Sequence, residues 1–112
     1  MKKYKTFKYQ NYKNCFFSVG RYQIGNNLAF QIESEKQGYI ADCTVNIANW
    51  NYPKDSFVTI KSYSENEGML KFLKNLGVVT EAYCKVPTGY VCADACIIDL
   101  DKLKEYTAVW NG

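Results

Sequence analysis

The sequence predicts an α+β fold, in which a mostly antiparallel sheet of five or six strands carries one amphipathic helix on one face. Three observations support this prediction. Runs rich in aromatic and β-branched residues fill the first half of the chain and are joined by short turns. One later segment, 65–76, has the i, i+3, i+4, i+7 apolar spacing of a helix that packs on a core. Strands do not alternate with helices, which argues against a doubly wound α/β fold.

The length and composition favour a single domain over residues 1–112. Of these residues 47% are hydrophobic and 16% are aromatic, and only two are proline, unlike a disordered chain. No apolar run is long enough to span a bilayer. The basic start is followed by no apolar segment of the kind found in secretory signals. We therefore expect a cytoplasmic protein without membrane contact.

Four strands in the first half form a predicted meander of antiparallel neighbours. Gly25 and Asn26 tolerate the positive φ angles of a tight turn, and Gly38 closes a second one. Apolar residues alternate with polar ones in the third strand, which predicts one covered and one wet face of the sheet. The four strands are expected at 3–9, 14–24, 28–34 and 38–48.

The second half contains further strand segments around the helix. Strand 57–63 leads into it, and two more strand segments flank a turn at Pro87-Thr88-Gly89. Residues 99–110 are either a short C-terminal helix, capped by Asp99 or Asp101, or an irregular tail.

Both ends of the predicted helix 65–76 show capping signals. Ser64 is a good N-cap and Glu67 stands three residues later, which predicts a capping box. At the other end, Gly77 fits the left-handed position after the helix, and Val78 fits the apolar position of a Schellman motif.

Gly68 falls inside the first turn of this predicted helix, where it lowers helix stability by up to about 1 kcal/mol relative to alanine. Because Phe72 leans back over position 68, we expect the glycine to make room for this ring or for the sheet beneath it. The alternative is that Gly68 lets a partner or ligand approach. Glu65 and Glu67 would repel a phosphate at the helix start, so we expect any partner there to be a basic protein surface.

The segment around this glycine also carries a family resemblance. Residues 57–92 resemble a family of small bacterial proteins of unknown function, in which a strand is followed by this motif, a short helix and a glycine with apolar neighbours. The resemblance implies an origin on a phage, plasmid or integrative element. Some small proteins in that setting inhibit host defence systems, including CRISPR nucleases. The resemblance supplies no catalytic residues, and the basic start of the chain departs from it. The motif consists of Tyr63, Ser64, Glu65, Asn66, Glu67 and Gly68.

Positive charge is concentrated at the start of the chain. Residues 1–32 contain five lysines, one arginine and no acid, whereas 33–112 contain eight lysines against eleven acids. Interleaved rings and lysines there offer stacking platforms and phosphate contacts for single-stranded nucleic acid. The alternative is an edge strand with its rings inward and its lysines outward. The residues are Lys2, Lys3, Lys5 and Lys8 with Tyr4, Phe7 and Tyr9.

No arrangement of residues indicates catalysis. The chain lacks histidine, so a cysteine or serine nucleophile has no customary base. An odd number of cysteines without an export signal favours reduced thiols. Zinc binding by Cys84, Cys92 and Cys96 is disfavoured by their wide spacing, and small core residues are the alternative. The remaining cysteines are Cys15 and Cys43.

We therefore expect a non-enzymatic binding protein that inhibits a host defence nuclease by occlusion, without cofactor or metal. The alternative is a nucleic-acid-binding module. An uncovered sheet face or an edge strand leaves room for a homodimer. The predicted partner-binding residues are Lys2, Lys3, Tyr4, Lys5, Lys8, Glu65 and Glu67, and the structural residues of the motif and helix are Tyr63, Ser64, Asn66, Gly68, Phe72 and Gly77.

Overall fold

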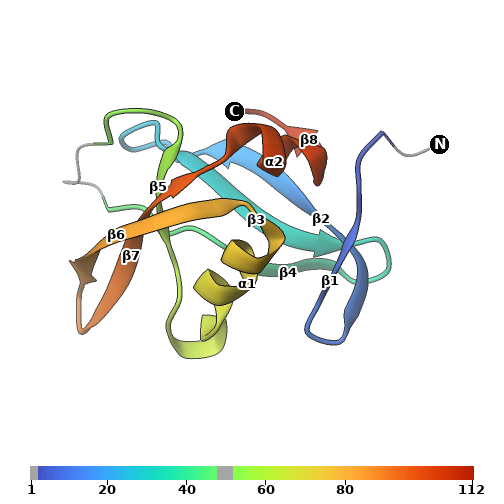
Figure 1. Cartoon of the computed structure of the whole chain (residues 1–112), viewed down its shortest axis with the longest axis horizontal. Coiled ribbons are helices and arrows are strands. Elements are labelled where there is room, and N and C mark those ends of the chain that lie inside the picture. Colours follow the sequence, from blue (N-terminus) through green and yellow to red (C-terminus); the bar gives the residue numbers. More distant parts are fainter. Residues whose placement is uncertain (1–2, 48–51) are drawn as a thin grey trace.

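The computed structural model describes residues 3–47 and 52–112, and this part of the chain forms eight strands and two α-helices. Figure 1 shows both helices packed against two sheets, so the predicted α+β class is confirmed. The elements are β1 (Phe7–Tyr9), β2 (Tyr12–Arg21), β3 (Leu28–Ser34), β4 (Gly38–Asp42), β5 (Phe57–Ile60), α1 (Met69–Leu76), β6 (Val79–Thr88), β7 (Val91–Ile98), α2 (Leu100–Glu105) and β8 (Thr107–Trp110), with a 3-10 turn at Ser64–Asn66.

The larger sheet contains the predicted meander, with β1, β2, β3 and β4 as antiparallel neighbours in chain order. Gly25 and Asn26 have φ angles of 85° and 56° in the turn between β2 and β3, and Gly38 has 73° at the start of β4. The apolar residues of β3 are buried and the residues between them are half-buried, as the alternation predicts. Local turn chemistry therefore sets this register.

Three strands are much shorter than the sequence predicts, and a fourth, expected at 14–24, runs from Tyr12 to Arg21. The N–H of Lys5 donates to the carbonyl of Glu105 at 2.8 Å, so the chain before β1 runs toward α2 instead of along β2. Segment 3–9 is a strand only at Phe7–Tyr9, 57–63 only at Phe57–Ile60, and 38–48, whose last residue Ala48 lies outside the described part, only at Gly38–Asp42.

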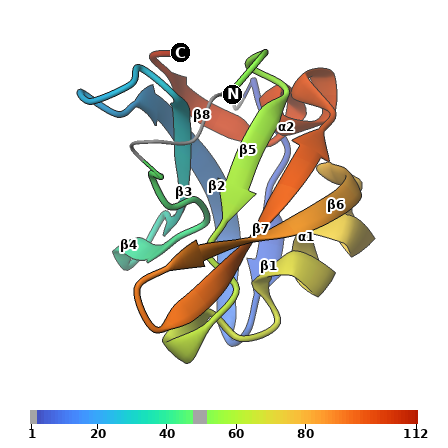
Figure 2. The ribbon, with the colours of Figure 1, turned by 90° about the vertical axis from the view of Figure 1, so that its left-hand side faces the viewer.

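The second sheet has the order β5-β7-β6 and crosses in front of the larger sheet in Figure 2. The strands expected in a single sheet are thus divided between two. The chain after β4 joins them, because the N–H of Val45 donates to the carbonyl of Thr59 and that of Lys61 to the carbonyl of Cys43, both at 2.9 Å. Pro87 lies in the edge strand β6, where a missing N–H is tolerated.

The hydrophobic core lies between the sheets and is closed by the two helices. Each large apolar side chain removed from water contributes about 1.5–3 kcal/mol. The ring of Phe72 on α1 packs against Phe7 and Tyr9 of β1, with centroids 5.5 and 5.0 Å apart, so the helix also covers the edge of the larger sheet. The largest fully buried side chains include Phe17, Ile32, Ile60, Met69, Leu73 and Leu103.

The start of α1 differs from the prediction. The helix begins at Met69 instead of residue 65, and Gly68 is its N-cap with a φ of 92°. The predicted capping box is wrong, since Ser64 has a φ of 55° and its side chain caps no helix. The predicted reason for the glycine is wrong too, because a Cβ at Gly68 would meet nothing within 4 Å. Its positive φ, not the space for Phe72, favours glycine there.

The end of α1 matches the predicted Schellman motif. Gly77 has a φ of 89°, and its N–H donates to the carbonyl of Lys74 at 3.1 Å. The N–H of Val78 donates to the carbonyl of Leu73 at 3.0 Å, and both side chains are fully buried. These bonds satisfy carbonyls that the helix end would otherwise leave without partners.

Residues 99–110 form the short helix α2 followed by a strand. The Asp99 side chain accepts from the N–H of Lys102 at 3.1 Å, which makes it the cap, as predicted. Strand β8 was not predicted, and it pairs in parallel with β2 through Phe17 to Val19. None of the helical segments in the described part has the length and apolar character that a bilayer crossing needs.

Candidate partner-binding site

The segment between β5 and α1 is fixed by one buried side chain. Asn66 is 2% exposed, and its Nδ2 donates to the carbonyls of Lys61, at 3.0 Å, and Asp42. Asp42 ends β4 in the larger sheet, and Lys61 follows β5 in the smaller one. A single amide therefore ties the turn before α1 to both sheets, and the neighbours of Asn66 in the sequence are held in defined positions.

Glu65 and Glu67, which flank Asn66, are both exposed. Glu65 Oε1 accepts from Lys61 Nζ at 2.7 Å, and this contact lowers the pKa of Glu65 and raises that of Lys61. Glu67 takes part in none of the ion pairs among the described residues. Both acids are accessible, and their role in partner binding stays a prediction. Lys61 also lies 5.8 Å from the ring centroid of the half-buried Tyr63.

A hollow of about 170 Å³ opens beside this turn. Its floor includes Tyr9, which is 5% exposed and whose ring packs edge-on against Phe72. Tyr12 and Tyr39 are 36% and 57% exposed, and they bring two further rings from the start of β2 and from β4. The residues that line the hollow are Tyr9, Gln10, Tyr12, Tyr39, Ile40, Ala41, Glu65 and Asn66.

Two tyrosines of this hollow, Tyr9 and Tyr39, have raised pKa values. Burial raises the pKa of Tyr9, and partial burial together with the nearby Asp42 carboxylate raises that of Tyr39. Neutral phenol rings present an electron-rich face that attracts cations. Together with Glu65, they make the hollow suited to a positively charged group and unsuited to an anion.

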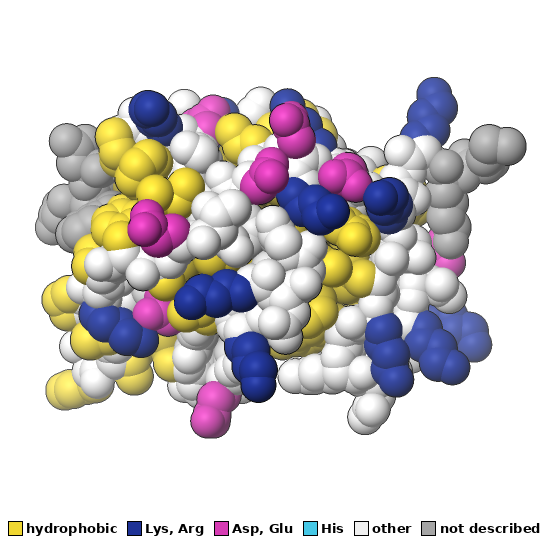
Figure 3. Space-filling model, viewed as in Figure 1, with side chains coloured by type: hydrophobic (Ala, Val, Ile, Leu, Met, Phe, Trp, Pro, Cys, Tyr) yellow, Lys and Arg dark blue, Asp and Glu magenta, His cyan; other side chains and the backbone are white. Residues whose placement is uncertain are grey.

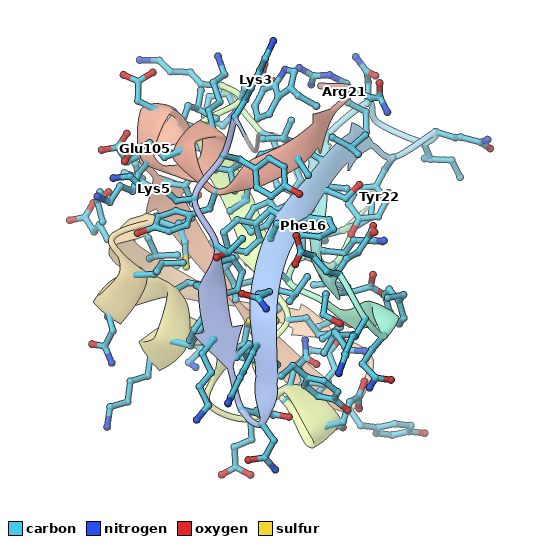
Figure 4. All side chains as sticks on the ribbon, turned by 90° about the vertical axis from the view of Figure 1, so that its right-hand side faces the viewer. Lys3, Lys5, Phe16, Arg21, Tyr22 and Glu105 are labelled. Atoms are coloured by element: carbon cyan, nitrogen blue, oxygen red, sulfur yellow. The ribbon has the colours of Figure 1, made fainter. Side chains whose placement is uncertain are left out.

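The lysines of the predicted basic surface at the N-terminus do not all stay available for a partner. Lys3 and Lys8 are exposed, whereas Lys5 Nζ bonds to Glu105 Oε1 at 2.8 Å, a contact that Figure 4 shows between the chain before β1 and α2. This pairing raises the pKa of Lys5 and lowers that of Glu105. Lys2 lies outside the described residues.

Two of the three rings of this segment, Phe7 and Tyr9, face the core, as in the edge-strand alternative, whereas Tyr4 packs on the other face of β2. Tyr4 packs edge-on against Phe16, with centroids 5.4 Å apart, and Phe7 packs against Phe17 at 4.8 Å. Tyr9 is buried against Phe72. The prediction that these rings are stacking platforms for nucleic-acid bases is therefore wrong for Phe7 and Tyr9, whose faces are covered by the core.

Lysines nevertheless gather at the end of the molecule where β1 turns into β2, as Figure 3 shows. Lys13 and Lys36 line one hollow of about 360 Å³ between the turn of β1 and β2 and the turn of β3 and β4. Neither they nor Lys8 take part in an ion pair within residues 3–47 and 52–112. This basic end is a second candidate surface.

The outer face of the larger sheet is uncovered around a shallow groove of about 360 Å³. Small residues form its floor, with Gly20 of β2 opposite Ala29 of β3. Tyr22 stands at one side, where its hydroxyl is 2.9 Å from Thr44 Oγ1 and burial raises its pKa. The homodimer expected through such a face stays a prediction.

The cysteines are free thiols, and they are not gathered in one place. Cys84 and Cys92 are exposed, but the register of β6 and β7 places them on opposite faces of the sheet. Cys96 is buried, and burial raises its pKa to about 12. No group of three or more His, Cys, Asp or Glu in the described part is placed to hold a metal ion.

Sequence reasoning identified Glu65 and Glu67 but missed the tyrosines beside them. Tyr12 lies two residues after Gln10 and Tyr39 directly after Gly38, and both of these turn residues have a positive φ. Large exposed rings beside such turns are a signal for binding, but the strand pattern of the sequence conceals it. No family model, no characterised protein and no solved structure matches this chain.

Proposed function

We propose that this protein is a non-enzymatic binding protein that docks on a basic protein surface. The docking surface consists of Tyr12, Tyr39, Glu65 and Glu67, and we call it the acidic tyrosine surface. The observation that carries the proposal is the pair of hydrogen bonds made by buried Asn66, because they fix the backbone that places Glu65 beside the exposed rings of Tyr12 and Tyr39, with exposed Glu67 in the same turn. Tyrosine is enriched at protein interfaces, and a preorganised surface loses little entropy on binding.

Inhibition of a host defence nuclease is the specific form of this function that we propose. The resemblance of residues 57–92 to proteins of mobile elements supports it. A nuclease channel that binds nucleic acid is basic, and an acidic surface complements such a channel. Binding there would occlude the nucleic acid, and no catalytic group of the inhibitor is needed.

Affinity capture tests this proposal. The tagged protein is expressed in bacteria that carry an active defence system, and the captured proteins and the restriction of an incoming phage are both measured. We expect one basic partner to be enriched and restriction to fall. The proposal is contradicted if no partner is recovered and restriction is unchanged.

Nucleic-acid binding is the second candidate function, and the lysines at the basic end favour it. Lys8, Lys13 and Lys36 offer phosphate contacts without stacked rings. A gel-shift series from low to high salt decides, because such contacts weaken steeply as salt rises. Binding that is absent at low salt, or insensitive to salt, excludes this function.

A further inference from the structure

We propose that the tyrosine hollow holds the guanidinium group of one arginine from the basic partner. This inference rests on the proposed function and names the group that the acidic tyrosine surface recognises. The hollow has a volume of about 170 Å³, and its lining offers the exposed rings of Tyr12 and Tyr39 and the carboxylate of Glu65, over the buried Tyr9. Aromatic rings with an adjacent carboxylate are the chemistry that binds a flat cation.

The floor of the hollow is rigid. The Tyr9 ring is held edge-on by Phe72 of α1 at 5.0 Å, and it is 5% exposed. Asn66, which also lines the hollow, is fixed by its two bonds to backbone carbonyls. Because neither residue has to be ordered when a guest binds, the side-chain entropy that the protein loses comes from exposed groups such as Tyr12, Tyr39 and Glu65.

The carboxylate at the rim has capacity for a second cation. Lys61 Nζ bonds to Glu65 Oε1, and the carboxylate also interacts with the backbone N–H of Glu65, which leaves acceptor capacity for a further donor. Glu65 has a side chain that is 69% exposed, so its pairing with Lys61 is a weak surface contact that a guest can share or displace. A guanidinium can stack on a tyrosine face while it donates to this carboxylate, which the compact ammonium of lysine cannot do equally well.

Charges of both signs lie around this site. Asp42 lies near Tyr39 and adds negative charge on the β4 side, and Glu67 is exposed in the same turn as Glu65. Lys61, which pairs with Glu65 and also acts on Tyr39, is a cation with which the guest shares this carboxylate. Lys13 lines the neighbouring hollow instead of this one. The carboxylates of Asp42 and Glu65 therefore face Lys61 at this site, and the lysines of the basic end line a different hollow.

A titration followed by two-dimensional NMR of the 15N-labelled protein tests this inference. The probe is Nα-acetyl-arginine methylamide, and the matched control is the citrulline analogue, which has nearly the same shape without the charge. We expect saturable shifts of the amide signals of Gln10, Tyr39, Glu65 and Asn66 with the arginine probe alone. Equal shifts with citrulline, no saturable shifts, or stronger binding of the lysine analogue would overturn the assignment.

Variants locate the binding and separate this inference from the proposed function. Tyr39→Ala and Glu65→Gln are expected to abolish the shifts, whereas Tyr90→Ala, at a fully exposed tyrosine outside the lining of the hollow, leaves them unchanged. Signal dispersion in the same spectra shows that each variant is folded, and Tyr39→Phe, which keeps the ring, retains binding.

If a captured partner binds Tyr39→Ala as tightly as wild type but not Glu65→Gln, the arginine site is refuted and the proposed function stands. If the arginine probe binds but no partner depends on these residues, the proposed function fails and the arginine site stands.

Discussion

The side-chain amide of Asn66 donates to the backbone carbonyl of Lys61 at 3.0 Å, from within a turn that is otherwise exposed. The same amide reaches the carbonyl of Asp42. The turn before α1 is thus held by a buried polar contact where the sequence predicts the first turn of a helix. The position of Glu65 and Glu67, and with it the acidic tyrosine surface, depends on this contact.

Asn66→Ala removes both hydrogen bonds and is expected to lower the free energy of unfolding by about 1–3 kcal/mol. Urea unfolding followed by circular dichroism measures this change. Asn75→Ala is the control, because Asn75 is exposed on α1 and forms none of the described side-chain hydrogen bonds. Equal stability of the two variants would show that the hydrogen bonds of Asn66 do not hold the turn.

Replacing two glycines by alanine distinguishes the cost of a positive φ angle from the cost of a steric clash of the new Cβ. A Cβ would meet nothing within 4 Å at either Gly68 or Gly20, but only Gly68 has a positive φ, 92°. Gly68→Ala is therefore expected to lower the free energy of unfolding by about 1–2 kcal/mol. Gly20→Ala in β2 should raise it by up to about 1 kcal/mol. Thermal melting of both variants measures these changes, and similar losses in both would mean that φ is not the deciding factor.

The five cysteines are expected to fall into two classes of reactivity. Cys84 and Cys92 are exposed and should react with a thiol reagent in the native protein at pH 8. Cys15, Cys43 and Cys96 are buried, and burial raises the pKa of each, that of Cys96 to about 12. Spectroscopic thiol counting should give two fast groups in buffer and five in denaturant. Five fast groups in buffer would contradict the burial of these thiols.

The forked contact between Arg21 and Asp55 predicts a pH dependence of stability. The guanidinium donates to both carboxylate oxygens, at 2.9 and 2.7 Å, and lowers the pKa of Asp55 below its usual 3.8. Because the folded-state pKa is the lower one, this stabilisation is present above about pH 4 and is lost as the pH falls through the folded-state pKa of Asp55. Asp55→Asn should reduce stability at pH 7 by at most about 1 kcal/mol, because Asp55 is half exposed.

Melting temperatures at pH 7 and pH 3 measure this effect. The difference between Asp55→Asn and wild type should shrink at pH 3. Glu81→Gln, which changes an exposed carboxylate outside the described ion pairs, should show no such convergence. A difference for Asp55→Asn that is constant with pH would contradict a charged contact.

The parts of the fold that the sequence predicted depend on local signals. Gly25, Asn26 and Gly38 mark the turns of the meander, and Gly77 marks the end of α1, because each needs a positive φ that few residues adopt. The start of α1 could not be predicted in this way. Ser64 and Glu67 have the spacing of a capping box, but the competing contacts of Asn66 come from Asp42 and Lys61, and the first of these is distant in the sequence.

Contacts between residues far apart in the sequence explain why strand β8 and the tyrosine hollow were not predicted. Strand β8 forms by parallel pairing with β2, so residues 107–110 contain no local turn signal that announces it. The hollow is likewise assembled from three separate segments, which contribute Tyr12, Tyr39 and Glu65. Glu65 was identified because charges at a helix start are readable in the sequence. The tyrosines were missed because their neighbours in space are set by the sheet register.

The most direct test of the acidic tyrosine surface is the dissociation constant of the captured partner, measured by calorimetry with two matched double variants. Glu65→Gln with Glu67→Gln removes charge from the acidic tyrosine surface, and Lys8→Gln with Lys13→Gln removes charge from the basic end. We expect the first pair to weaken binding by about tenfold or more, which corresponds to about 1.4 kcal/mol, and the second pair to leave it unchanged. Binding that is lost with the lysine pair and kept with the glutamate pair would contradict the acidic tyrosine surface as the contact.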